Sequence, residues 1–213
     1  TIITVPSSKE KAISVLSWIE EAFDEGSMER ILTAFLADEV QYGTILYRAL
    51  KVAHRLKHRE ALTYFKDPDI MNLYDLYRKV VRLQHLMLGV IRFQELKSGV
   101  FYAYFEPDYN ILPLLTDHFK ERLGDQLWVI HDGLRHQAAF YDGKAVFINP
   151  VEMALNLDFS DQEGRFQELW QSYFKHIAIK ERHNPRCQRS FLPQKYWKFL
   201  VEDSQNRREN TKI

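Results

Sequence analysis

The chain has 213 residues, of which 46% are hydrophobic and 27% are charged. This balance is typical of a globular protein and excludes wholesale disorder. The 29 Lys and Arg residues equal the 29 Asp and Glu residues, which excludes a uniformly basic nucleic-acid binder but not a local basic patch. The single cysteine, Cys187, excludes a disulfide within the chain and an iron–sulfur cluster held by its own thiolates.

The same features predict a cytoplasmic protein. A lone cysteine suits a reducing compartment. The longest uncharged stretches are far shorter than the roughly 18 apolar residues of a membrane helix. The first residues lack the basic and then apolar order of a signal peptide. We expect no membrane contact, no cofactor and no metal ion bound by this chain.

The first half of the chain predicts helices. Ser7 or Ser8 can cap a helix that runs to about Phe23, with apolar residues on one face. Apolar residues at helical spacing place further helices at residues 31–36, 45–62 and 70–96. The turn Asp67-Pro68-Asp69 separates the last two of these helices.

The hydrophobic period changes after residue 98. Alternating and aromatic-rich runs predict strands at residues 100–105, 127–131, 137–141 and 144–148. Pro113 suits the first turn of a helix at residues 112–122, and Asp142-Gly143 is a hairpin signal. The middle third therefore predicts a small antiparallel sheet of about four strands.

The last part of the chain predicts helices again. Ser160 and Glu163 have the spacing of a capping box. The helix that they open should run to about residue 180 and bury its apolar residues, which are Phe166, Leu169, Trp170, Tyr173, Phe174 and Ile177. A short helix should follow at residues 194–200.

Together these elements predict an α+β fold that is mainly helical. We expect one domain over residues 1–213, made of a helical part (7–97), a sheet (98–150), C-terminal helices (160–201) and a frayed tail (202–213).

Charge is unevenly distributed along the chain. Residues 1–47 are acidic, whereas residues 48–59 hold five Lys or Arg, two His and no acid. Residues 180–198 hold six Lys or Arg, one acid and the rings of Phe191, Tyr196 and Trp197. Such cations neutralise phosphates and such rings stack on bases. An alternative stays open, in which these arginines pair with carboxylates and Trp197 anchors a helix.

Three polar residues are candidates for acid–base or metal chemistry. Asp108 and Asp132 follow predicted strands, and His118 lies on the helix between them. Carboxylates and imidazoles perform such chemistry, but polar residues at strand ends more often cap turns. His54 and His58 have a spacing that zinc sites use, yet no third ligand accompanies them.

Five sequence blocks stand out between residues 85 and 200. They are RFQEL (92–96), GVFYAYFEPDYNILPLL (99–115), HF (118–119), WVIHD (128–132) and IAIKERHNPRCQRSFLPQKYWKFL (177–200). Through these blocks the chain resembles a bacterial family of DNA-metabolism and DNA-repair proteins without a known mechanism. In that family the gene commonly accompanies one for a radical S-adenosylmethionine (radical SAM) protein. In other bacteria a similar domain is fused to a uracil-DNA glycosylase-like domain.

The resemblance implies an association with DNA repair but transfers no catalytic residue. The polar positions within the shared blocks are Arg92, Glu95, Glu106, Asp108, Asn110, His118, Asp132, Arg182, Asn184 and Arg186. We treat them as candidates for one site, because loops and strand ends concentrate function.

Three hypotheses follow from these observations. The leading one is a DNA-repair accessory protein that binds DNA and a repair enzyme, such as the radical SAM protein. Its candidate nucleic-acid contacts are Arg55, Arg59, Arg92, Arg182, Asn184, Arg186, Arg189, Lys195 and Trp197. The second is an enzyme acting on damaged or modified DNA through Asp108, His118 and Asp132. The third is a protein-interaction module that offers acidic residues 10–39 to a basic partner.

Overall fold

A computed structural model describes residues 6–39, 41–151, 157–177 and 184–201. The chain divides into two compact units, Thr1–Arg82 and Leu83–Ile213, and each is described here by itself. Whether they form the single domain expected over residues 1–213 stays a prediction. Across the described ranges, no helix combines the length and the apolar character needed to cross a membrane.

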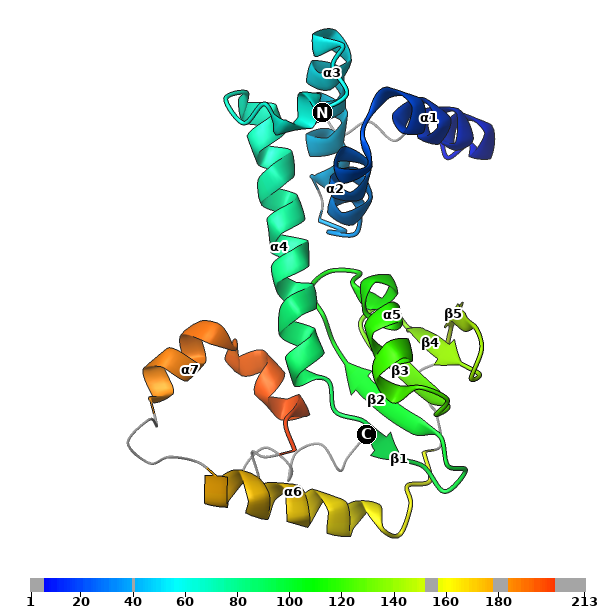
Figure 1. Cartoon of the computed structure of the whole chain (residues 1–213), viewed down its shortest axis with the longest axis vertical. Coiled ribbons are helices and arrows are strands. Elements are labelled where there is room, and N and C mark those ends of the chain that lie inside the picture. The colour runs from blue at the N-terminus through cyan, green and yellow to red at the C-terminus, as the bar shows by residue number, and fades with distance from the viewer. Residues whose placement is uncertain (1–5, 40, 152–156, 178–183, 202–213) are drawn as a thin grey trace. The chain divides into compact units, whose positions relative to one another are not determined.

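The first unit is helical, as its apolar periodicity predicts (Figure 1). Its elements are α1 (Lys9–Ala22), α2 (Glu25–Phe35), α3 (Tyr42–Leu56), the 3-10 helix η1 (Ala61–Thr63) and the first part of α4 (Pro68–Val90). Ser8 caps α1, since its side chain accepts a hydrogen bond from the backbone N–H of Lys11. The core of the unit includes Ile19, Phe23 and Ile31, which are almost fully buried.

The second unit contains a five-stranded sheet in the order β1-β2-β3-β4-β5 (Figure 1). The strands are β1 (Gln94–Glu95), β2 (Phe101–Phe105), β3 (Trp128–Asp132), β4 (Gln137–Tyr141) and β5 (Val146–Pro150). The helix α5 (Leu112–Leu123) connects β2 to β3 and buries Leu115 and Phe119 in the core. Three further helical elements follow the sheet, namely α6 (Glu163–Ile177), α7 (Pro185–Phe191) and the 3-10 helix η3 (Gln194–Phe199).

The predicted fold class is confirmed, but the predicted sheet is wrong in two respects. β2 and β3 run parallel, with Tyr102 opposite Val129, because the intervening helix α5 returns the chain to the same end of the sheet. The structure also has a fifth strand. β1 pairs antiparallel with β2 through Gln94 and Tyr102, so residues that were expected to continue a helix belong to the sheet.

This extra strand shortens the long helix expected at residues 70–96. α4 ends at Val90, and the guanidinium of Arg92 donates hydrogen bonds to the carbonyls of Gly89 and Ile91 at that end. Gly99 then turns the chain into β2 with a φ of 79°, a conformation that glycine adopts without strain.

The prediction that α6 buries its apolar residues is also wrong. Phe166, Leu169, Trp170, Tyr173 and Ile177 are each more than 40% exposed, and the side chain of Phe174 lies outside the description. The helix is held to its own unit by polar groups instead. A carboxylate oxygen of Glu163 accepts a hydrogen bond from the backbone N–H of Glu95, 3.0 Å away, so Glu163 joins α6 to β1 rather than closing a capping box.

Candidate nucleic-acid interface

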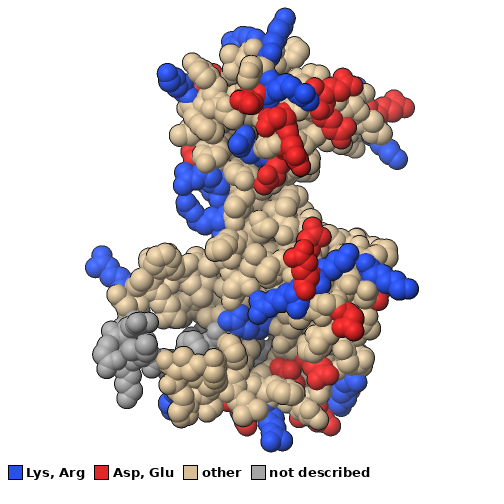
Figure 2. All heavy atoms as spheres, in the orientation of Figure 1, with Lys and Arg blue, Asp and Glu red and all other residues tan. Residues whose placement is uncertain are grey.

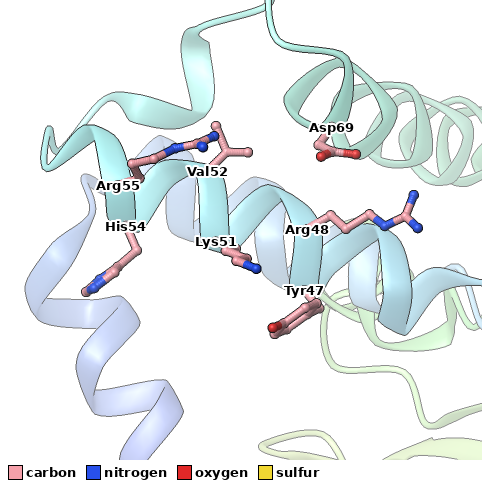
Figure 3. A pocket seen from close by; sticks show the side chains of 7 residues that line it. All are labelled: Tyr47, Arg48, Lys51, Val52, His54, Arg55 and Asp69. Atoms are coloured by element: carbon pink, nitrogen blue, oxygen red, sulfur yellow. The ribbon is translucent and has the colours of Figure 1, made fainter. Parts of the chain in front are cut away.

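A cationic surface lies on α3 in the first unit. Arg48, Lys51 and Arg55 stand at i, i+3 and i+7, a spacing that places them along one side of the helix. Together with Asp69 and neighbouring residues of α3, they line a surface hollow of about 550 Å³ (Figure 3). Within the described part of the chain no carboxylate lies within ion-pair distance of these three cations. We call them the α3 cationic surface.

Aromatic rings adjoin this surface. The side chain of Tyr47 is 64% exposed. Figure 3 shows Tyr47, Lys51 and His54 projecting from the same side of the helix. The ring of His54 meets the edge of Trp18 on α1, with ring centroids 5.6 Å apart. An exposed ring therefore lies beside the α3 cationic surface, a combination typical of proteins that bind single-stranded nucleic acids.

The acidic residues of the N-terminal segment lie on and beside α1 and α2. Figure 2 shows many acidic side chains of this unit on one face, with Lys and Arg side chains beside several of them. Two of these acids make contacts within the unit: Glu39 pairs with Lys79 at 3.4 Å, and Glu29 accepts a hydrogen bond from Tyr77.

A second cluster of polar residues surrounds the carboxyl ends of the parallel strands β2 and β3. The carboxylate of Asp132 is fully buried and lies 3.3 Å from the guanidinium of Arg135. It also accepts hydrogen bonds from the backbone N–H groups of Leu134 and Arg135. Burial raises the pKa of Asp132 above its ordinary value, although Arg135 and these N–H groups oppose the shift.

Arg135 also fixes the loop that follows β2. Its guanidinium donates hydrogen bonds to the carbonyls of Pro107 and Asp108, each 3.0 Å away. One side chain thereby links the turn after β3 to the loop after β2. Because Asp132 pairs with Arg135, it helps to hold the turn after β3 and the loop after β2 together.

His131 is another buried ionisable residue of this cluster. It is 3% exposed, and its Nδ1 shares a 2.8 Å hydrogen bond with the hydroxyl of Tyr102. Burial lowers the pKa of His131, the charge of Asp132 opposes this, and His136 adds to it. Burial also raises the pKa of Tyr102 to about 12. Both side chains are therefore neutral at pH 7.

The loop after β2 also binds the C-terminal 3-10 helix η3 through two ion pairs. Lys195 pairs with Asp108, and Lys198 pairs with Glu106. Burial acts to raise the pKa of Glu106, but hydrogen bonds from Lys198 and Tyr104 outweigh it and the pKa is lowered. Lys195 and Lys198 thus have acidic partners, whereas the α3 cations have none among the described residues.

The predicted catalytic residues have different side-chain partners. Asp108 pairs with Lys195 and Asp132 pairs with Arg135, whereas His118 is exposed on α5 with its ring against Phe119. No group of three or more His, Cys, Asp or Glu in the described ranges is arranged to hold a metal ion. A catalytic role for these residues stays a prediction.

The predicted nucleic-acid contacts fall into several groups. Arg55 belongs to the α3 cationic surface, and Arg59 is exposed shortly after α3. Arg186 and Arg189 are exposed on α7, while Arg182 lies outside the described residues.

The remaining contacts have roles inside the second unit. Asn184 caps α7 by accepting a hydrogen bond from the N–H of Cys187, and the indole N–H of Trp197 donates to the carbonyl of Leu192. Arg92 holds the end of α4, and Lys195 pairs with Asp108. The contact of Trp197 with Leu192 agrees with the alternative in which Trp197 anchors a helix.

Comparison with known proteins places most of the chain in one family. A family model described as a domain of unknown function, DUF4130, matches residues 40–202 of the 213. The chain belongs to this family. No curated protein and no solved structure matches the chain. The DUF4130 match includes all of α3 and the carboxyl ends of β2 and β3. Both the α3 cationic surface and the polar cluster at these strand ends therefore lie in the matched region.

The sequence alone did not identify Arg48, Lys51 or Arg135 of the DUF4130 domain as site residues. Arg48 and Lys51 are in the basic stretch, but only the spacing along α3 identifies them as partners of Arg55. Arg135 follows Asp132 by three residues, a spacing that an Asp-capped turn permits. That spacing is the sequence signal that could have predicted the contact between Asp132 and Arg135.

Proposed function

We propose that this protein binds nucleic acid through the α3 cationic surface and acts as an accessory protein in DNA repair. The observation that carries the proposal is the row formed by Arg48, Lys51 and Arg55, which has no acidic partner within the described residues. A cation without an internal partner is available to neutralise a phosphate and release its counterions. The DNA-repair assignment rests on the sequence blocks shared with the bacterial family.

Fluorescence anisotropy with labelled single-stranded and duplex DNA tests the binding. The protein should bind at about 50 mM salt and weaken steeply as salt rises. The variant R48Q/K51Q/R55Q should lose tenfold or more in affinity, and its logarithmic salt slope should fall by about two to three.

A matched control variant changes the same number of charges elsewhere. Lys120, Lys144 and Arg165 are exposed in the second unit and have no side-chain ion pair among the described residues. Their triple Gln variant should bind DNA within about twofold of the unchanged protein. Absence of binding at low salt, or equal losses in the two triple variants, would refute the proposed interface.

The proposed repair partner is tested separately. We propose that the chain associates with a radical SAM protein, whose gene accompanies the bacterial family that the sequence blocks resemble. Where the domain is fused, the partner would be a uracil-DNA glycosylase-like domain. The two proteins should co-elute after co-expression at low salt. Failure to associate would refute the proposed partner but not the proposed DNA binding.

A further inference from the structure

Tyr47 places an exposed ring next to the α3 cationic surface. It directly precedes Arg48 on α3, and its side chain is 64% exposed. Other rings of the first unit contact one another, as Trp18 does with Phe23 at a centroid distance of 5.5 Å. Among the described residues, no ring or cation lies against the ring of Tyr47. This ring is therefore accessible to a ligand.

Helical spacing places this ring beside the cations. Lys51 follows Tyr47 by four positions and His54 follows Lys51 by three, so the three side chains lie along one side of α3 (Figure 3). Arg48 and Arg55 form the neighbouring row, which Lys51 also joins. Tyr47 and Lys51 are about 6 Å apart along the helix axis. A phosphate on Lys51 and a neighbouring base on Tyr47 can therefore belong to one strand.

The three cations alone do not select a single strand. Counterion release per neutralised phosphate is larger for a duplex, with a logarithmic salt slope of about 0.9 against about 0.7 for a single strand. Cations acting alone therefore favour the duplex. Stacking acts in the opposite direction, because the bases of a duplex are stacked on one another, whereas a single strand can offer a base to a ring. One stacked base strengthens binding about fivefold to a hundredfold.

We propose that the α3 cationic surface binds single-stranded DNA in preference to duplex DNA, with one base stacked on Tyr47 and the adjoining phosphates on Arg48, Lys51 and Arg55. The inference rests on the proposed DNA binding and adds the form of the DNA to it. Figure 3 shows Asp69 on one side of α3 and Tyr47 on the other. The carboxylate of Asp69 repels phosphates, so the strand follows the side of α3 that carries the ring.

Fluorescence anisotropy with the full chain compares three labelled probes. They are a short oligothymidylate, the same backbone without bases, and a duplex of equal length. At about 200 mM salt the oligothymidylate should bind about fivefold or more tightly than either other probe. Raising the salt from about 50 mM should widen the preference over the duplex, because the duplex has the steeper salt dependence. Equal or tighter binding of the duplex at about 200 mM salt would overturn the inference.

Variants of Tyr47 attribute the preference to its ring. Tyr47→Ala should weaken oligothymidylate binding about fivefold or more and leave the other two probes within about twofold, whereas Tyr47→Phe should bind like the unchanged protein. The matched control is Tyr64→Ala, which removes a 49% exposed ring of the first unit that does not line the hollow, and it should change nothing. Circular dichroism establishes that each variant is folded. Equal losses on all three probes in Tyr47→Ala would contradict stacking on this ring.

Asp69→Asn tests the path of the strand. Removing this carboxylate should strengthen the binding of all three probes by a similar factor, below about fivefold, because it acts on phosphates and not on bases. A gain confined to the oligothymidylate would place the base at Asp69 and overturn its position on Tyr47.

The inference and the proposed function fail in different ways. If R48Q/K51Q/R55Q binds every probe as the unchanged protein does, the α3 cationic surface is not the DNA interface and both are wrong. If this triple variant loses affinity but the unchanged protein shows no preference for the oligothymidylate, only the inference is wrong. Oligouridylate of equal length that binds more than about tenfold more tightly than oligothymidylate would identify RNA as the ligand and overturn the assignment to DNA.

Discussion

Replacing Arg135 by Met should expose how strongly the strand edge depends on one buried ion pair. The substitution keeps an unbranched apolar stem but removes the guanidinium that lies 3.3 Å from the fully buried carboxylate of Asp132. It also removes the two hydrogen bonds that hold the carbonyls of Pro107 and Asp108. The backbone N–H groups that contact Asp132 remain.

The expected cost follows from leaving a buried charge without its partner. Removing one member of a buried ion pair typically costs about 3–5 kcal/mol of folding free energy. Burial already raises the pKa of Asp132 above the ordinary 3.8, so the folded state binds a proton in a range where the unfolded state does not. The folded pKa should rise further in Arg135→Met. Its destabilisation should therefore be largest at neutral pH and shrink as the pH falls toward that pKa.

Urea denaturation, followed by tryptophan fluorescence and circular dichroism, measures this effect. Asp132→Asn is the matched variant, because it retains an oxygen acceptor for the backbone N–H groups while removing the charge. The double variant should be more stable than the sum of the two single effects predicts, with a coupling of about 0.5–3 kcal/mol. A cost below about 1 kcal/mol for Arg135→Met at pH 7, or simple additivity, would refute the buried ion pair as the anchor.

Two further predictions concern stability. Because burial lowers the folded pKa of His131 below 6.5, the unfolded state takes up the proton first, and stability should fall as the pH drops through 6.5. His131→Gln should remove part of that fall, at most about 1.4 kcal/mol per pH unit. Identical denaturation profiles of His131→Gln and the unchanged protein from pH 7.5 to 5.5 would contradict this. Gly99→Ala should cost about 1–2 kcal/mol because its φ is 79°, whereas Gly89→Ala in α4, where a Cβ meets no atom within 4 Å, should stabilise by up to about 1 kcal/mol. Thermal melts showing the same sign for both glycines would disprove that reasoning.

Local signals predicted much of the secondary structure. Ser8 caps α1 as expected, and the strands at β2, β3 and β4 lie where alternating and aromatic residues placed them. These features depend on residues close together in the chain, such as a side-chain oxygen three positions from the N–H that it accepts from. The helix predicted up to residue 96 failed at β1, because pairing with β2 outweighs the local helical pattern.

The sites divide in the same way. The basic stretch at residues 48–59 was visible in the sequence, and helical spacing accounts for the row of Arg48, Lys51 and Arg55. The second basic stretch looked equivalent, yet Lys195 and Lys198 pair with Asp108 and Glu106, which lie 87 and 92 positions earlier in the chain. Composition cannot distinguish a neutralised cation from an unpaired one, because the pairing depends on contacts between distant segments.

By itself the sequence determined a mainly helical α+β chain, its lone cysteine, and the separation of acidic from basic segments. Only the tertiary structure decided that β2 and β3 run parallel, that Asp132 is buried beside Arg135, and that apolar residues of α6 are exposed. The physical reason is that strand direction, burial and ion pairing are set by residues far apart in the chain. Periodicity and capping act within a few residues, which is why the sequence reveals them directly.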